Sequence, residues 1–344
     1  MKAVQIGSFG GMDTLRCCVV KAPEPGPGEV RVKVAAASFN PADYKMRLGY
    51  VGGTLPMVLG KDFSGVIDRI GEGVDGLAKG DEVYGYIGGP ASNGTYAEYL
   101  CAPSAFVALK PTKLSFEEAA AVPLAGLTAY ECVSKAGRLV GLSVFIAGGS
   151  GGVGSMAVQF ARTAGAGLII ALAGSERSRR YLRDVLDIPD WCILAYSGRC
   201  IEEVKDDVIE LNQGSGVNVA FDFVGKDMKR LCFNVLGFDG HLITIVPEDR
   251  DFSMNIWDRK DSHTYARSLT VTCEFLGARA VNGCSKDWWV YRNTLNKVTE
   301  LIDCGSVKPP VITRVGGLSV ETVMRAHTIL ESGHGLGKLV MTIG

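Results

Sequence analysis

A glycine-rich hexapeptide carries the clearest chemical signal in the sequence. The segment Gly149-Ser150-Gly151-Gly152-Val153-Gly154 fits the pattern G-x-G-x-x-G, and it stands between an apolar run that predicts a strand and one that predicts a helix. In that setting the first glycine permits a tight turn, the second lets a pyrophosphate approach the backbone, and the third lets helix and strand pack closely. The N–H groups and dipole of a helix N-terminus hold phosphates. The loop therefore predicts a dinucleotide site, with a purely structural turn as the alternative.

The residues after the next predicted strand indicate which dinucleotide is bound. An NAD-binding protein usually has Asp or Glu at the end of this strand, where it binds the ribose hydroxyls. Here the strand at 168–173 is followed by Ser175, then by Glu176, Arg177 and Arg179. A small polar loop with guanidinium groups suits a 2′-phosphate, which a carboxylate would repel. We expect NADPH rather than NADH, although these arginines also fit a solvated helix face.

Alternating strands and helices surround the loop. The predicted strands are 143–147, 168–173, 192–195, 217–223, 241–246 and 269–276, and the predicted helices are 153–164, 176–186, 201–211 and 228–236. Such alternation is typical of α/β proteins with a doubly wound, parallel sheet of the Rossmann type.

The two ends of the chain have a different pattern of predicted secondary structure. Short strands punctuated by Gly and Pro fill the first 110 residues, and alternation of valine with charged residues over 30–34 is typical of a half-buried strand. The end of the chain predicts a helix followed by Gly305, a strand at 311–315, a helix at 319–331 and a strand at 339–343. We therefore expect a nucleotide-binding domain at 125–280, inserted into a β-rich domain made of 1–124 and 281–344.

Composition limits the class of protein. A chain of 344 residues suits two domains, and its net charge of −1 argues against nucleic acid as the main partner. The longest apolar run, near 166–173, is too short for a membrane helix, and the start lacks the apolar core of a signal peptide. The 10 Cys form no Cys-x-x-Cys pair. We expect free thiols, no membrane partner and a cytoplasmic location.

Six short segments occur in a recognisable order. They are Asn40-Pro41-Ala42-Asp43-Tyr44-Lys45, Gly60-Lys61-Asp62-Phe63-Ser64-Gly65-Val66, Gly80–Gly85, Gly94–Tyr99, Pro123–Tyr130 and Gly337-Lys338. This ordered set, which covers essentially the whole chain, resembles the zinc-free quinone oxidoreductase (ζ-crystallin-like) branch of the medium-chain dehydrogenase/reductase superfamily. The resemblance implies a GroES-like β-barrel-type domain from both chain ends around the Rossmann domain. It also implies a homodimer that pairs through the last Rossmann strand, near 269–277.

The resemblance also bears on metal. Zinc alcohol dehydrogenases of this superfamily carry Cys, a His-Glu pair and a second Cys where this chain has Asn40, Lys61-Asp62 and Leu124. Catalytic zinc needs three N, S or O ligands, which Lys61 and Leu124 cannot supply. The histidines, which have no metal-like spacing, are His241, His263, His327 and His334. We expect no metal. Without a Lewis acid, reduction of a quinone or an electron-poor C=C bond is easier than oxidation of an alcohol.

By the same resemblance, the nicotinamide lies in a cleft lined by Asn40, Tyr44, Lys45 and Thr128. Asn40 would donate to the cofactor carboxamide or to a substrate oxygen. Tyr44 and Lys45 would bind a developing enolate or hydroquinone oxygen. An exposed helix surface is the alternative for Tyr44 and Lys45, and a turn before Pro is the alternative for Asn40.

The resemblance implies further cofactor contacts. Ser175 and a following basic residue, Arg177 or Arg179, would hold the 2′-phosphate. Tyr196 would pack near the adenosine phosphate, and Lys338 would lie near the pyrophosphate. A half-buried tyrosine at a strand end is the alternative for Tyr196.

The resulting hypothesis is an NADPH-dependent reductase that passes hydride to a small quinone or α,β-unsaturated carbonyl compound. An enoyl-thioester reductase with a longer pocket is one alternative. A non-catalytic NADPH-binding sensor or structural protein is another, because this branch has no obligatory catalytic base whose loss the sequence would show. A short-chain ketoreductase is excluded, because the sequence has no Tyr-x-x-x-Lys motif.

Overall fold

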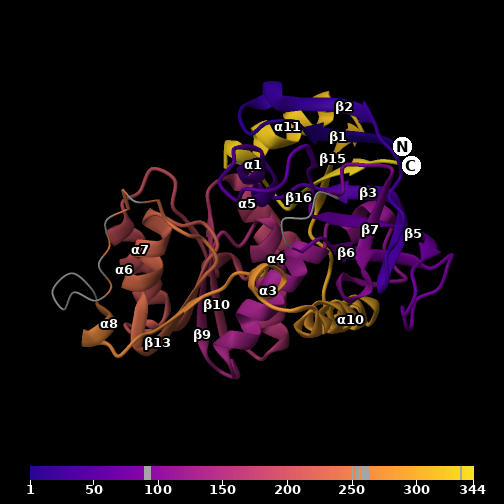
Figure 1. The fold of residues 1–344 in the computed structure, drawn as a ribbon. Helices are drawn as coiled ribbons and strands as arrows, with labels where there is room; N and C mark the ends of the chain where they lie inside the picture. Colours follow the sequence, from indigo (N-terminus) through magenta and orange to yellow (C-terminus); the bar gives the residue numbers. More distant parts are fainter. Residues whose placement is uncertain (89–93, 250, 253, 255, 257–262, 334) are drawn as a thin grey trace. The chain divides into compact units, whose positions relative to one another are not determined.

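The computed structural model describes residues 1–344 except 89–93, 250, 253, 255, 257–262 and 334 (Figure 1). His334 and the side chain of His263 therefore lie outside the described residues. The chain forms two compact units. Unit 1 comprises Met1–Leu127 and Leu276–Gly344, and unit 2 comprises Thr128–Phe275. In the described part of the chain, every helix is too short or too polar to cross a membrane.

Unit 2 is built on one parallel sheet of six strands. In spatial order they are β11 (Ile193–Ala195), β10 (Leu168–Ala173), β9 (Ser143–Ala147), β12 (Val217–Asp222), β13 (Leu236–Thr244) and β14 (Thr270–Cys273). Every residue of β9 is buried, as expected of a central strand covered on both faces. The strand order reverses beside β9, which makes the carboxyl end of β9 the topological switch point. The predicted doubly wound α/β sheet is confirmed.

The helices of unit 2 follow the strands. They are the end of α3 (Pro123–Ala136), α4 (Gly152–Thr163), α5 (Glu176–Arg180), α6 (Ile201–Leu211), α7 (Asp227–Asn234) and α8 (His263–Ala266). Figure 1 shows α6 and α7 side by side. The helix predicted at 176–186 keeps α-helical bonding only to Arg180, and the turn at 181–185 is a π-helix. The strand predicted at 241–246 begins earlier, at Leu236, because Leu236 pairs with Val217 across an irregular register.

Unit 1 contains two sheets. The larger has the order β15 (Ile312–Gly317), β16 (Lys338–Thr342), β3 (Glu29–Ser38), β5 (Asp62–Ile70), β6 (Glu82–Tyr86) and β8 (Val107–Leu109), with β7 (Tyr99–Pro103) also paired to β3. The smaller has the order β2 (Leu15–Val19), β1 (Lys2–Ile6) and β4 (Met57–Val58). Antiparallel pairing of β16 with β3, Val340 opposite Ser38, joins the end of the chain to its beginning.

The helices of unit 1 are short except for two near the end of the chain. They are α1 (Pro41–Arg47), α2 (Phe116–Ala120), the start of α3, α9 (Ala278–Asn282), α10 (Trp289–Asp303) and α11 (Val320–Glu331). A capping box begins α2, because the Ser115 hydroxyl accepts from the Glu118 N–H at 3.2 Å. The helix ends at Ala120, and α3 begins three residues later at Pro123, a residue suited to a first helical turn.

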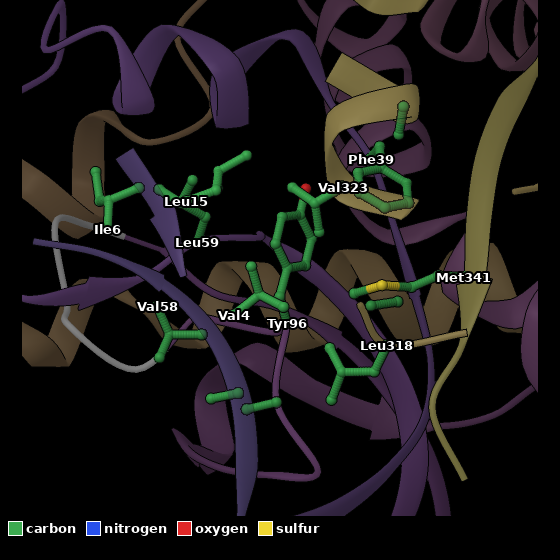
Figure 2. Packing of buried hydrophobic residues seen from close by; sticks show 14 of the residues in the cluster. Val4, Ile6, Leu15, Phe39, Val58, Leu59, Tyr96, Leu318, Val323 and Met341 are labelled. Carbon is green, nitrogen blue, oxygen red and sulfur yellow. The ribbon is translucent and has the colours of Figure 1, made fainter. Parts of the chain in front are cut away.

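A buried apolar cluster connects the small sheet of unit 1 to α11 and to the segment before α1 (Figure 2). Phe39 and Tyr96 lie at its centre, with ring centroids 5.0 Å apart. Val323 from α11 packs beside both rings, and Met341 from β16 lies below Phe39. This packing fixes Phe39, and therefore the position at which Asn40 begins α1.

Candidate functional site

The glycine loop of unit 2 joins β9 to α4 at the carboxyl edge of the sheet. A Cβ atom on Gly154 would lie 2.0 Å from the carbonyl oxygen of Gly148, so only glycine fits this contact between helix and strand. A Cβ on Gly149 would meet the Ala171 side chain at 3.3 Å, which is also tight. A Cβ on Gly151 would meet no atom closer than 3.4 Å. Packing inside the unit therefore does not require glycine at position 151, which is compatible with close approach of a ligand there.

The loop also presents unused backbone donors. Gly151 is the N-cap of α4 and has no side chain to bond the first-turn N–H groups. The N–H groups of Gly152, Val153 and Gly154 have no acceptor among the described residues. Ser150 precedes them on the half-exposed part of the loop. These donors, with the positive end of the helix dipole, suit a pyrophosphate.

In the loop after β10, the two arginines predicted to bind the 2′-phosphate have different surroundings. Ser175 is exposed and caps α5 by accepting from the Ser178 N–H at 3.2 Å. Arg179 is already engaged, with Nη2 2.6 Å and Nε 2.9 Å from the carboxylate of Asp190. This bidentate pair raises the pKa of Arg179 and lowers that of Asp190. Arg177 is exposed and has no ion pair with any described residue. Of the two, it is the one available to a ligand.

Tyr196 follows β11 beside the same loop. Its side chain is half-buried, and its hydroxyl is the atom that a Cβ on Gly174 would meet first, at 2.6 Å. The next residue, Ser197, donates from its hydroxyl to the Gly174 carbonyl at 2.7 Å. The structure thus places Tyr196 against the loop that carries Ser175.

The sequence analysis did not predict a buried polar cluster around Asp222, which forms where β12 and β13 end. Asp222 accepts the N–H of Gly225 at 2.7 Å and the hydroxyl of Thr244 at 2.7 Å. Lys229 pairs with Glu248 at 2.7 Å, and its ammonium lies 3.8 Å from Asp222. These contacts fix the loops at the carboxyl edge. Asp222 could have been found from the sequence, because it lies at the end of a predicted strand and Gly225 follows shortly after it. The residues next to Lys229 in the sequence do not indicate that its side chain is buried.

Unit 1 holds a second polar cluster, centred on Asp62 at the start of β5. Its Oδ2 accepts from Ser38 Oγ at 3.0 Å, from Asn40 Nδ2 at 2.8 Å and from Lys338 Nζ at 3.0 Å. Its Oδ1 accepts the N–H of Leu124 at 2.8 Å. Lys338 Nζ also donates to Asn40 Oδ1 at 2.5 Å. The structure therefore brings Asn40 and Lys338, which are almost three hundred residues apart in sequence, into direct contact.

Asp43 lies beside this cluster and is fully buried. Its Oδ2 accepts from the Tyr96 hydroxyl and from the Asn40 N–H, each at 2.8 Å, while Oδ1 has no partner among the described atoms. Burial raises the pKa of Asp43 to about 6, against the opposing hydrogen bonds. Burial also lowers the pKa of Lys61, although the nearby carboxylates of Asp43 and Asp62 act in the other direction.

Tyr44 and Lys45 lie on α1 and are both half-buried, which does not match a freely exposed helix surface. Burial, and then the charge of Glu331, raises the pKa of the Tyr44 phenol, which keeps it protonated and able to donate. The helix is fixed from behind by Arg47, which is buried and pairs with Glu331 and with His327 of α11. Thr128, the remaining predicted residue, is buried in α3 and belongs to unit 2.

The residues at the expected zinc positions do not fit a metal ion. Asn40 and Asp62 supply oxygen atoms, but those atoms already accept from the ammonium of Lys338. Leu124 takes part through its backbone N–H, a donor that repels a cation. Across the described residues, no group of three or more His, Cys, Asp or Glu is placed to hold a metal.

Comparisons with known proteins identify both parts of the chain. The family model of the alcohol dehydrogenase GroES-like domain matches residues 26–112, and that of the zinc-binding dehydrogenase matches residues 199–341. A zinc-type alcohol dehydrogenase-like protein of Staphylococcus epidermidis is 32% identical over 100% of both chains. A 2-methylene-furan-3-one reductase of Solanum lycopersicum is 32% identical over 99% of this chain and 79% of its own.

Solved structures agree with the family models. The crystal structure of an NAD-dependent alcohol dehydrogenase superposes with a TM-score of 0.85, at 30% identity and 100% coverage of both chains. A mycobacterial protein solved in complex with NADPH superposes with a TM-score of 0.82, at 25% identity, over 99% of this chain and 100% of its own. The predicted GroES-like domain alongside the Rossmann domain is confirmed. The chain belongs to the medium-chain dehydrogenase/reductase superfamily, in its quinone oxidoreductase-like branch, and is an NAD(P)-dependent oxidoreductase.

Proposed function

We propose that this protein is a metal-independent, NADPH-dependent reductase of small quinones or α,β-unsaturated carbonyl compounds. The observation that carries the proposal is the Asp62 cluster. Where a metal-dependent relative needs ligands, Asn40 and Asp62 are bound by an ammonium group. Because these oxygen atoms accept from Lys338, they are poorly suited to bind a metal, which supports a reaction without a Lewis acid. The site can still serve acceptors whose own conjugation delocalises the incoming charge.

The cofactor, when bound, supplies a hydride, and the overall reaction consumes NADPH, one proton and the acceptor to give NADP⁺ and the reduced acceptor. The glycine loop, from Gly149 to Gly154, would hold the pyrophosphate. Ser175 and Arg177 would hold the 2′-phosphate, with Tyr196 beside the adenosine. Thr128, in unit 2, would line the nicotinamide site as a fourth catalytic residue beside Asn40, Tyr44 and Lys45.

Unit 1 would supply the donors for the acceptor. Reduction of a conjugated carbonyl places negative charge on its oxygen, and donors already oriented toward that oxygen stabilise the transition state. We assign this role to the Asn40 amide, the Tyr44 hydroxyl and the Lys45 ammonium. The final proton would come from water. The similarity to the 2-methylene-furan-3-one reductase of Solanum lycopersicum supports this substrate class.

The test is anaerobic NADPH oxidation by the purified protein with quinones, short enones and enoyl-thioesters, and with NADH in parallel. Quinone or enone turnover that is faster with NADPH than with NADH is the expected result. Turnover confined to enoyl-thioesters would instead indicate an enoyl-thioester reductase. Tight NADPH binding without turnover of any acceptor would favour a sensor.

Replacing Arg177 with alanine is expected to remove the preference for NADPH. A charge-assisted contact to phosphate contributes about 1.5–3 kcal/mol, so the Kd of NADPH should rise about 10- to 100-fold while that of NADH changes little. Kd values are measured by titrating the quenching of protein fluorescence.

The matched control is Arg179→Ala, which removes the same group two residues away. Because Arg179 is bound to Asp190, this variant should lose about 0.5–1 kcal/mol of stability and keep its NADPH preference. Loss of the preference in Arg179→Ala but not in Arg177→Ala would transfer the role to Arg179.

A further inference from the structure

We propose that Lys338 and Asp62 are positioning residues that orient the Asn40 amide, and that Lys338 does not act as a pyrophosphate ligand. The proposal rests on the proposed function, in which Asn40 donates to the acceptor oxygen. It gives the buried ammonium of Lys338 a specific task, namely to decide which way the amide points.

The amide can take only one orientation in this cluster. Lys338 Nζ donates to Asn40 Oδ1, and Asn40 Nδ2 donates to Asp62 Oδ2. If the amide were turned by half a rotation, its NH₂ group would face an ammonium and its oxygen would face a carboxylate. Both contacts would be repulsive, because an ammonium only donates and an ionised carboxylate only accepts. The ion pair therefore selects one amide orientation.

That orientation leaves one donor unused. A side-chain amide has two N–H groups, and the bond to Asp62 uses one of them. The second N–H of Asn40 has no acceptor among the described residues. Asp62 itself accepts four hydrogen bonds, three at Oδ2 and one at Oδ1, so it holds the surrounding donors in place. The chemistry available at this point is donation by Asn40.

The groups that hold the amide are anchored in regular structure. Ser38 ends β3 and lies opposite Asp62 in the pairing with β5, and Lys338 is the first residue of β16. Lys338 and Asp62 are 5% and 0% exposed, so solvent does not weaken their attraction as it does at a surface. A donor held by rigid strands loses little freedom when the reaction begins, which is the condition for effective stabilisation of charge.

The experiment is a double-mutant cycle of Lys338→Met and Asn40→Ala, with kcat/KM for the best acceptor as the main readout. We expect each single variant to lower kcat/KM about 10- to 100-fold, the range found when a reacting or supporting group is misplaced. In the Asn40→Ala background, Lys338→Met should have almost no further effect, because the group that it orients is absent. The Kd of NADPH should change by less than about threefold, since no cofactor contact is removed.

The control is Lys110→Met in the same unit. Lys110 is equally buried, with 7% of its side chain exposed, and it pairs with Glu82 away from Asn40. This variant should keep kcat/KM, even if its thermal unfolding temperature falls. Lys338→Met leaves Asp62 charged and buried, so the double variant Lys338→Met/Asp62→Asn, which removes both charges, is made in parallel. It should fold and show the same loss of kcat/KM.

Three results would overturn the proposal. A rise of tenfold or more in the Kd of NADPH with unchanged kcat would make Lys338 a cofactor ligand. Multiplying effects of the two substitutions would show that Lys338 acts independently of Asn40. Full activity of Lys338→Met/Asp62→Asn would show that the ion pair is only structural. If Asn40→Ala alone retains full activity, the role of Asn40 in the proposed function is wrong. The single variant shows this result independently of any effect of Lys338→Met.

Discussion

Gly154→Ala is expected to lose NADPH binding and to destabilise unit 2 by about 3 kcal/mol, the upper part of the range for overpacking a tight contact. The three nearest atoms to the added methyl group are all backbone atoms, namely the oxygen and carbon of Gly148 at 2.0 and 2.7 Å and the Cα of Gly149 at 2.7 Å. No side chain can rotate away. The contact can relax only if α4 moves off β9, and that movement displaces the N–H groups that we propose hold the pyrophosphate. Thermal unfolding and NADPH titration measure the two losses.

Gly151→Ala is expected to weaken NADPH binding with little loss of stability, unlike Gly154→Ala. Gly151 has φ −78° and ψ 177°, values open to any L-residue, and its added methyl group meets nothing within 3.4 Å. The stability cost should stay below about 1 kcal/mol, the scale of a changed N-cap. The Kd of NADPH should nevertheless rise about tenfold or more, because the methyl group would occupy the path of the pyrophosphate. Unchanged binding in Gly151→Ala would contradict the assignment of this loop to the pyrophosphate.

The sequence was most informative where a local rule determines the structure. The glycine loop is such a case, because a tight strand-to-helix turn needs glycine at positions that can be read in order. Alternation of strands and helices over 143–276 was sufficient for the parallel sheet for the same reason. Strand ends were less accurate. In β3 the pattern of alternating valines stops at Val34, yet the strand continues through three alanines to Ser38, because pairing with β5 and β16 sustains it.

The candidate site shows where local rules end. Arg177 and Arg179 are equivalent in sequence, and only the folded position of Asp190 distinguishes them. The contact of Lys338 with Asn40 and Asp62 depends on β16 joining β3, a pairing across most of the chain. Resemblance placed Lys338 near a phosphate, whereas the structure surrounds its ammonium with an amide and a carboxylate of its own unit. No pattern within a few residues of Lys338 contains that information.

Long-range pairing of the same kind leads to the largest stability effect expected in unit 1, that of Arg47→Met. Arg47 is 1% exposed at the end of α1 and binds three groups. Its guanidinium pairs with Glu331, donates to the Gly10 carbonyl at 2.6 Å and lies 3.3 Å from His327 Nδ1. Methionine retains the apolar stem but leaves these acceptors without a donor. Removal of one partner of a buried pair costs about 3–5 kcal/mol, and we expect about 3 because Glu331 is 35% exposed and can regain water.

Urea unfolding at pH 7 measures this loss, and two further variants show whether it comes from the pair. Arg69→Met removes the same group from a surface pair with Glu24, in which both side chains are more than half exposed, and should cost less than about 1 kcal/mol. Glu331→Gln, alone and combined with Arg47→Met, completes a double-mutant cycle. The double variant should lose less stability than the sum of the two single losses, because both substitutions remove the same interaction. Since Asn40 is the N-cap of α1, and α1 carries Tyr44 and Lys45, the folded fraction of Arg47→Met should also bind its acceptor more weakly. A loss as small as that of Arg69→Met would mean that packing of Phe39 and Tyr96, rather than the ion pair with α11, holds α1 in place.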